Sequence, residues 1–291
     1  MKLIQYFLFV FLSFSIQSQM ILNQNGEAFN ESQFFNTSFI VKNKIKTIQG
    51  TYSFKKDGDL IREVPGSYTY TFNQSGKLTS MIDIKWNGKT LDTIVHYFSF
   101  DKSGKLLTIK ESEFGGVTQK EMLYDSVGRI VSITNFRVAL DKFGTTIKST
   151  EVNQETFSYR GGKKTTYNSY GLPYLISTEE KDADGYLVSR KEKLKRSGTI
   201  STNKYQYNAK GYLDRIETFY DKTVEPVETI SFLYDPFGNL TERLHKKMNI
   251  LVNELQLIYD DKTQLLYSII RRNPSTNFMA IIRFKTYEYY P

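Results

Sequence analysis

The chain has 291 residues, a formal net charge of +8 and no cysteine, and 40% of its residues are apolar and 15% aromatic. This apolar content is enough to bury a core, which excludes a disordered chain, and the absence of cysteine excludes a disulfide framework. The basic charge favours partners that carry negative charge.

The first 18 residues have the pattern of a secretory signal peptide. Lys2 supplies a positive start, and an almost uninterrupted apolar run extends from Leu3 to Phe14. We expect cleavage after Ser18, with a retained membrane anchor as the alternative, and no transmembrane helix after cleavage. An exported protein without disulfides indicates a bacterial periplasm, cell surface or extracellular location, where nucleic acid is not an expected partner.

The remaining chain divides into a polar lead-in at residues 19–37 and a single β-repeat domain at residues 38–291. Residues 38–54 alternate well enough for one or two strands. Tyr68, Tyr70 and Phe72 fall at every second position, which predicts a strand, and His96 and Phe98 share one face of a later strand. No stretch after the signal peptide has the caps and spacing of a long amphipathic helix.

One short pattern returns along the domain: an aromatic residue, Asp or Asn, two free positions, Gly, one free position and an aliphatic residue. Asp or Asn accepts a hydrogen bond from the backbone two residues further on, and Gly supplies the positive φ that turns the chain back into a hairpin. We interpret these residues as turn formers rather than ligand-binding groups. In the best copies they are Asp101 and Gly104, Asp125 and Gly128, Asn208 and Gly211, and Asp235 and Gly238.

The spacing of the repeated turns indicates a meander. Successive turn glycines from Gly58 to Gly238 lie 14 to 28 residues apart, and most of the longer gaps fit two strands and a return turn such as Asn87-Gly88. The predicted fold is therefore all-β, a long antiparallel meander of about eighteen strands with very little helix. It is either curled into a partly closed shell or stacked as an extended sheet.

The string from Tyr234 to Leu240, together with that from Tyr124 to Ile130, resembles the YD repeats of the RHS family of exported bacterial proteins. The resemblance covers residues 52–266. It implies a large antiparallel sheet that spirals into a hollow shell, often around a carboxy-terminal toxin, and a location at the cell surface. The 53 residues after Gly238 continue the strand pattern, so we expect no toxin here.

No residue pattern identifies a catalytic or metal centre. His96 and His245 lie far apart without metal-ligand spacing, and we expect His96 to be a satisfied core histidine. The Asp182–Gly185 turn resembles the start of a calcium loop but lacks the downstream Glu. We therefore expect no metal and no cofactor. Paired carboxylates would suffice for glycan cleavage, with candidates that include Glu111, Glu113, Glu179 and Glu180.

Two features are candidates for ligand binding. Lys191, Lys193 and Lys195 share one side of a predicted strand and form a basic stripe, which also fits edge protection. Tyr205 and Tyr207 belong to a group of clustered tyrosines that would stack on sugar rings or pair across strands.

The sequence favours an exported, non-enzymatic β-repeat protein that acts as a binding or structural module at the bacterial cell envelope or surface. Its expected partner is an anionic glycan or another envelope protein. Two alternatives stay open: an outer-membrane β-barrel, suggested by the many strands of about ten residues and the abundant tyrosine, and a glycan-cleaving enzyme with paired carboxylates. A mean hydropathy of −0.43 and 24% charged residues weigh against the barrel.

Overall fold

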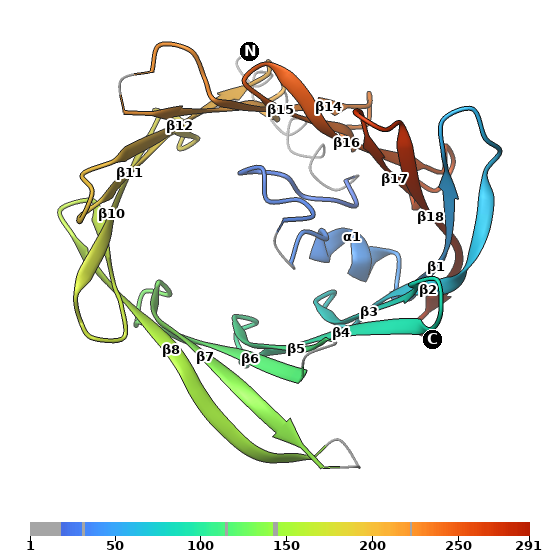
Figure 1. The fold of residues 1–291 in the computed structure, drawn as a ribbon, viewed down its shortest axis with the longest axis horizontal. Coiled ribbons are helices and arrows are strands. Elements are labelled where there is room, and N and C mark those ends of the chain that lie inside the picture. Colours follow the sequence, from blue (N-terminus) through green and yellow to red (C-terminus); the bar gives the residue numbers. More distant parts are fainter. Residues whose placement is uncertain (1–18, 31–32, 114–115, 142–144, 222) are drawn as a thin grey trace, which may run out of the picture.

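The computed structural model describes residues 19–291 except 31–32, 114–115, 142–144 and 222, so the predicted signal peptide lies outside the described residues. Figure 1 shows a ring of strands around a lumen that holds the amino-terminal part of the described chain. The prediction of an all-β antiparallel protein with about eighteen strands is confirmed, because the described residues form one sheet of 18 strands.

The described chain has one α-helix, and its strands follow one another directly. The helix is α1 (Thr37–Lys42), and the first nine strands are β1 (Ile45–Lys55), β2 (Arg62–Phe72), β3 (Leu78–Trp86), β4 (Leu91–Phe100), β5 (Leu106–Glu113), β6 (Gly116–Tyr124), β7 (Ile130–Leu140), β8 (Thr146–Arg160) and β9 (Lys163–Tyr167). The remaining nine are β10 (Pro173–Lys181), β11 (Leu187–Leu194), β12 (Ile200–Tyr207), β13 (Leu213–Tyr220), β14 (Glu228–Tyr234), β15 (Leu240–Lys247), β16 (Ile250–Tyr259), β17 (Leu266–Asn273) and β18 (Phe278–Tyr289).

The sheet closes into a barrel. Each strand pairs antiparallel with its neighbours in the chain, and β1 pairs with both β2 and β18, where Tyr52 lies opposite Val64 on one side and Ile282 on the other. The expectation of an extended or only partly closed sheet is therefore corrected. Closure satisfies the backbone groups that the two edge strands of an open meander would leave unpaired.

The repeated turns have the hydrogen bonds that their residue types predict. The Asp101 carboxylate accepts from the backbone N–H groups of Ser103 at 2.8 Å and Lys105 at 2.9 Å, and the Gly104 N–H donates to the Asp101 carbonyl. The carboxylates or amides of Asp125, Asn208 and Asp235 accept from the backbone N–H four residues on in the same way. These turns connect consecutive strands at one end of the barrel, which we call the turn rim.

Two copies of the pattern lie at the opposite end, the return rim. Asp141 forms its turn between β7 and β8, and Asn168 forms its turn between β9 and β10. The β8–β9 connection at Gly161-Gly162 lies between them at the turn rim, where it takes the place of a repeated turn. Since consecutive antiparallel connections alternate between the two ends, this exchange explains the irregular glycine spacing between residues 128 and 185.

Tyrosines near strand ends connect neighbouring hairpins at the turn rim. Each hydroxyl donates to the carbonyl of the first residue of the preceding strand, at 2.5 to 3.0 Å. The six pairs are Tyr124–Leu106, Tyr159–Ile130, Tyr207–Leu187, Tyr234–Leu213, Tyr259–Leu240 and Tyr287–Leu266. Tyr124, Tyr207 and Tyr234 are the aromatic residues of the repeated pattern, and each thus binds its repeat to the one before it.

The segment that the sequence presents as a polar lead-in folds inside the barrel. Phe34 and Phe35 are at most 6% exposed, and Ile21 forms an isolated β-bridge with Phe35. Where the sequence predicts only strand after residue 38, the chain first forms α1. The Asn36 side chain caps this helix by accepting from the Ser38 N–H at 3.1 Å, a local bond that competes with strand pairing.

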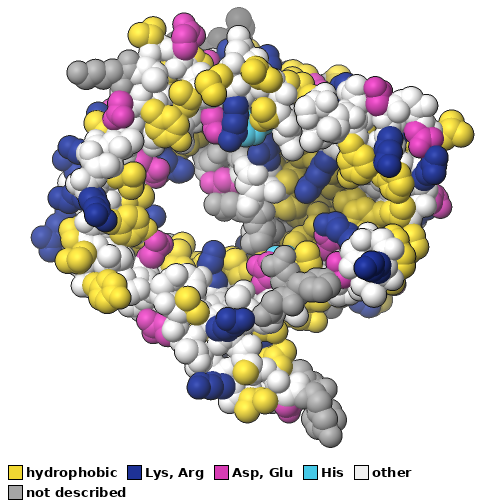
Figure 2. Space-filling model, viewed as in Figure 1, with side chains coloured by type: hydrophobic (Ala, Val, Ile, Leu, Met, Phe, Trp, Pro, Cys, Tyr) yellow, Lys and Arg dark blue, Asp and Glu magenta, His cyan; other side chains and the backbone are white. Residues whose placement is uncertain are grey.

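The apolar face of the wall points into the lumen. In β2, Tyr68, Tyr70 and Phe72 are buried, while Thr69 and Thr71 alternate with them and are more exposed. Figure 2 shows the hollow ring with hydrophobic side chains along part of its inner wall. The hydrophobic core is therefore the contact between this wall and the amino-terminal segment.

Candidate functional site

The described part of residues 19–42, which we call the plug, fills one side of the lumen beside β1, β2 and β3 (Figure 1). The ring of Phe35 packs edge-on against Tyr70 and Phe72, with centroids 4.8 and 4.9 Å apart. Met20, Ile21 and Ala28 are almost completely buried. Burial of this many apolar side chains makes the plug part of the folded barrel rather than a loose tail.

Polar contacts fix the plug to strands on both sides of the lumen. The Asn23 amide donates to the Tyr234 hydroxyl at 3.1 Å, and the Gln33 amide donates to the Leu78 carbonyl at 3.2 Å. The Arg243 guanidinium, on β15, donates to the Asn30 side-chain oxygen at 2.8 Å. These bonds connect the plug to β3, β14 and β15.

A cavity of about 870 Å³ separates the plug from the wall formed by β2 to β7. Its plug side presents Phe29, Asn30, Gln33 and Phe34. The wall side is mostly aromatic and aliphatic and includes Tyr68, Tyr70, Met81, Phe98, Phe100, Leu106, Ile109, Met122, Tyr124, Ile130 and Ile133. A large apolar cavity with a few polar groups is the usual form of a small-molecule site.

The charged residues of this cavity are mainly basic. Lys77, Lys120 and Arg271 line it, with Glu111 as the acidic residue among its lining. Glu111 is already close to His96, whose Nδ1 lies 3.7 Å from a carboxylate oxygen. His96 was expected in the core; it lies half-buried on the cavity wall, with its ring stacked on Phe98 at 6.3 Å.

The two groups of predicted binding residues lie on opposite faces of the wall. Lys191 and Lys193 are exposed on the outer face of β11, and Lys195 is exposed in the turn that follows. Tyr205 and Tyr207 point inward and belong to the luminal core or pack against it. The structure therefore does not bring the basic stripe and the tyrosines together as one surface.

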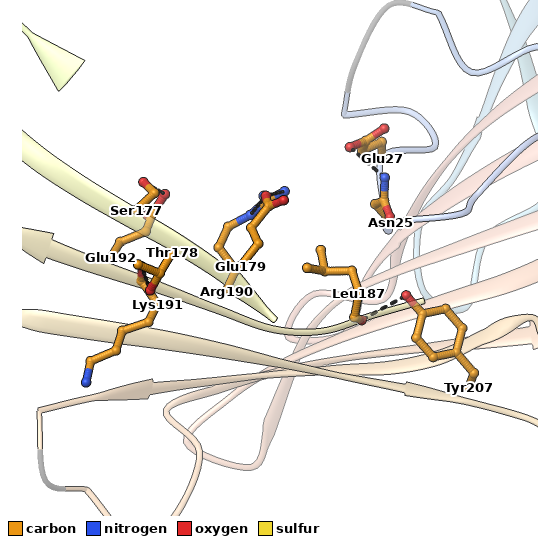
Figure 3. A network of polar contacts seen from close by, with 10 residues as sticks. All are labelled: Asn25, Glu27, Ser177, Thr178, Glu179, Leu187, Arg190, Lys191, Glu192 and Tyr207. Carbon is orange, nitrogen blue, oxygen red and sulfur yellow. Dashed lines mark hydrogen bonds and ion pairs between the residues drawn. The ribbon is translucent and has the colours of Figure 1, made fainter. Parts of the chain in front are cut away.

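Figure 3 shows the contacts around Lys191, one residue of the basic stripe. The Glu179 carboxylate accepts from Arg190 at 3.0 Å, and these two side chains point away from the direction taken by Lys191. The Ser177 hydroxyl is 3.2 Å from the Glu192 carboxylate. On the luminal face, Arg190 therefore pairs with Glu179, and Glu192 lies beside Ser177. The lysines alternate with Arg190 and Glu192 along the chain and lie on the outer face.

The candidate carboxylates for glycan cleavage are distributed over different parts of the wall. Glu111 lines the luminal cavity beside His96, whereas Glu179 pairs with Arg190 on the other side of the ring. Glu180 follows Glu179 on the alternate face of β10, and the Glu113 side chain lies outside the described residues. Among the described residues, no group of three His, Cys, Asp or Glu side chains is placed to hold a metal ion.

His245 also lies next to a carboxylate. Its Nε2 is 3.6 Å from Glu228, which pairs with Lys247 at 3.1 Å.

α1 is the one α-helix of the described residues, and it is not long and apolar enough to cross a bilayer.

No protein-family model matches the chain, and no curated protein matches its sequence. Among solved structures, a porin-like protein from Bacteroides uniformis aligns over 84% of this chain and 98% of its own, with 13% identity and a TM-score of 0.40. A porin-like protein from Bacteroides vulgatus aligns over 85% of this chain and 98% of its own, with 8% identity and a TM-score of 0.30. The Photorhabdus luminescens Tc holotoxin pore aligns over 74% of this chain, with 12% identity and a TM-score of 0.31.

This chain spans 14% of the toxin chain that it matches. TM-scores of this size are too low to establish a common fold. The strongest indication of function is therefore the plugged lumen with its apolar, basic cavity.

Proposed function

We propose that this protein is an exported, non-enzymatic binding module of the bacterial cell envelope that holds its ligand inside a closed barrel. The observation that carries the proposal is the inward direction of the apolar wall, which leaves a cavity of about 870 Å³ against the plug. A site of that size accommodates a small or medium-sized organic molecule. Relationship to the YD-repeat proteins is part of the same proposal, supported by the repeated turns and by the tyrosine that joins successive repeats.

The outer face of the barrel is rich in polar residues. On β12, Lys204 and Gln206 alternate with the buried Tyr205, and on β13 the outward Glu217 lies opposite Lys204. Arg215 and Glu217, on the same outward face of β13, form an ion pair at 3.6 Å. A lipid-facing Lys or Arg costs about 2–4 kcal/mol at the bilayer midplane, so such a face favours contact with water.

Binding in the lumen is tested with two variants on neighbouring residues of β5. Ile109→Trp fills the cavity, because Ile109 lines it, whereas Thr108→Trp adds the same ring on the exposed outer face. Residues 19–291 are prepared without detergent, and the binding of the apolar fluorophore N-phenyl-1-naphthylamine is titrated. We expect the first variant to weaken binding and the second to leave it unchanged. Equal affinities of all three proteins would refute the luminal site.

An outer-membrane barrel is the second candidate, favoured by the closed antiparallel barrel with an even number of strands. Exposed apolar side chains such as Leu123, Leu233 and Ile258 occupy outward positions on three strands and would contribute to a lipid-facing band. Light scattering in the absence of detergent decides between the two. A monodisperse, β-rich protein supports the water-facing barrel, and aggregation that only detergent reverses supports the membrane.

The Lys191, Lys193 and Lys195 stripe remains a candidate outer surface for an anionic glycan or another envelope protein. Because these lysines lie outside the lumen, replacing all three with Gln tests this surface without altering the cavity. Loss of binding to an acidic polysaccharide together with unchanged fluorophore binding would assign the two ligands to separate sites.

A further inference from the structure

Two arginines face the same apolar lumen. Arg271 on β17 lies opposite the buried Leu255 and lines the cavity. Arg243 on β15 contacts the plug through neutral acceptors, the Asn30 side-chain oxygen and the Ala28 carbonyl. Burial and the nearby positive charge of Arg271 together lower the pKa of Arg243. The lumen therefore concentrates like charges that repel one another.

The carboxylates near these arginines already have partners. Asp83, which is buried opposite Tyr68 on β3, accepts a hydrogen bond from the Tyr52 hydroxyl and pairs with Lys85. Across the described residues, Arg271, Arg243, Lys77 and Lys120 form no ion pair. The Glu111 carboxylate of the cavity is already beside His96. The Arg271 side chain makes no hydrogen bond to a described residue, which leaves its five N–H donors free for a ligand.

The surroundings of Arg271 combine this charge with aromatic surface. Its positive charge reaches the hydroxyls of Tyr68 and Tyr70 and counteracts the rise in their pKa that burial causes. The same cavity continues along Phe98, Ile109 and Met122. A guanidinium in a cavity with a largely aromatic and aliphatic wall matches a molecule with one anionic group and an apolar body, because it pairs with carboxylate or phosphate through two parallel hydrogen bonds.

We propose that the luminal cavity binds an amphipathic anion, with its carboxylate or phosphate head group on Arg271 and its apolar body between the plug and the aromatic wall. This inference rests on the proposed binding function and names the chemical class of its ligand. The head group neutralises the repulsion between the arginines, and the apolar body covers luminal surface that the plug leaves open.

The test compares ligands that share one alkyl chain. Calorimetric titrations at low salt use dodecanoate, dodecyl phosphate and dodecanol, each below its aggregation concentration, with the plugged barrel of residues 19–291. A charged hydrogen-bonded contact contributes about 1.5–3 kcal/mol, which corresponds to about a tenfold to hundredfold difference in affinity. We expect at least one of the anions to bind that much more tightly than dodecanol, and the better anion identifies the head group.

Arg271→Gln removes the proposed partner, and Arg283→Gln removes the same charge from the outer face of the adjacent strand β18. We expect the first variant to abolish the preference for the anion and the second to retain it. Arg271→Lys keeps the charge but loses the paired hydrogen bonds, so it should retain only part of the preference. Since Arg271 has no partner to lose, Arg271→Gln should not lower the urea midpoint of unfolding.

The outcomes separate the two proposals. Equal binding of dodecanol and both anions, unaffected by Arg271→Gln, would overturn the anion site while leaving an apolar binding cavity. Absence of binding by all three ligands would overturn the binding function itself. A lower unfolding midpoint of Arg271→Gln with an unchanged ligand preference would assign Arg271 a structural role and refute the inference.

Discussion

Replacing Gly238 by alanine should destabilise the barrel more than the same change at a turn with open space around it. Gly238 has φ +90°, and an added Cβ would lie 2.3 Å from the Tyr212 hydroxyl oxygen and 2.7 Å from the Gln19 amide nitrogen. The Gln19 side chain can move away. The Tyr212 ring is held against the Tyr234 ring at a centroid distance of 5.0 Å, so relief there requires a shift of two packed aromatic rings.

Gly171 provides the matched control. It also has a positive φ, +72°, in a turn of the same pattern, but an added Cβ would meet nothing within 4 Å. Both alanine variants bear the cost of a left-handed backbone, about 1–2 kcal/mol. Gly238→Ala adds the cost of overpacking, about 1–3 kcal/mol. We therefore expect a loss of about 1–2 kcal/mol for Gly171→Ala and about 2–5 kcal/mol for Gly238→Ala.

The measurement is urea unfolding followed by far-UV circular dichroism, completed by a double-mutant cycle with Tyr212→Ala. Because removal of the Tyr212 ring opens the space that the new Cβ needs, Gly238→Ala should cost less in the Tyr212→Ala background than alone. Equal losses for the two glycine variants would refute the steric reasoning, as would a Gly238→Ala cost that stays the same without the Tyr212 ring.

Two further predictions concern the repeated pattern. Tyr234→Phe removes the hydrogen bonds of the hydroxyl to the Leu213 carbonyl and the Asn23 amide, so it should lower the free energy of unfolding in urea by about 1–3 kcal/mol. Tyr97→Phe, on the exposed outer face, is the control and should lower it by almost nothing. Similar losses of stability in the two variants would contradict a role for the inter-repeat bond. Hydrogen bonds from the Ser103 hydroxyl and the Lys105 backbone lower the pKa of Asp101, so its contribution to stability is complete above the unfolded value of about 3.9 and is lost as the pH falls through the lower folded value. Asp101→Asn should keep the turn, as Asn does at position 208. The variant should lose less of its urea midpoint than the wild type as the pH falls from about 4 to the lower folded pKa. An acid dependence equal to that of the wild type would exclude a contribution of Asp101 ionisation to stability.

The turns and the strand number follow from the sequence because their causes are local. Asp101 and Gly104 form a turn through bonds within five residues, and such bonds need no distant partner. Alternation such as Tyr68, Tyr70 and Phe72 likewise identifies a strand with one apolar face. The irregular glycine spacing around Asn168 also has a structural cause, since the Asn168 turn lies at the return rim.

The same alternation does not say whether the apolar face points into or out of a closed sheet. That direction depends on what fills the lumen, and the plug that fills it has the polar composition of a lead-in, with Phe34 and Phe35 among Asn and Gln residues. The sequence contains no signal for this placement, because the plug gains its structure only from contacts with strands such as β2 and β14, which are distant in the chain.

The candidate site was beyond sequence reasoning for a related reason. Lys191, Lys193 and Lys195 are recognisable as a group because they are close in the sequence, whereas Arg271 comes from β17 and meets Tyr68, Phe98 and Met122 only when β1 joins β18 to β2. Local chemistry therefore determined the strands and turns of this protein. Closure of the barrel, a contact between the two ends of the domain, decided which side chains face the lumen and which charges meet there.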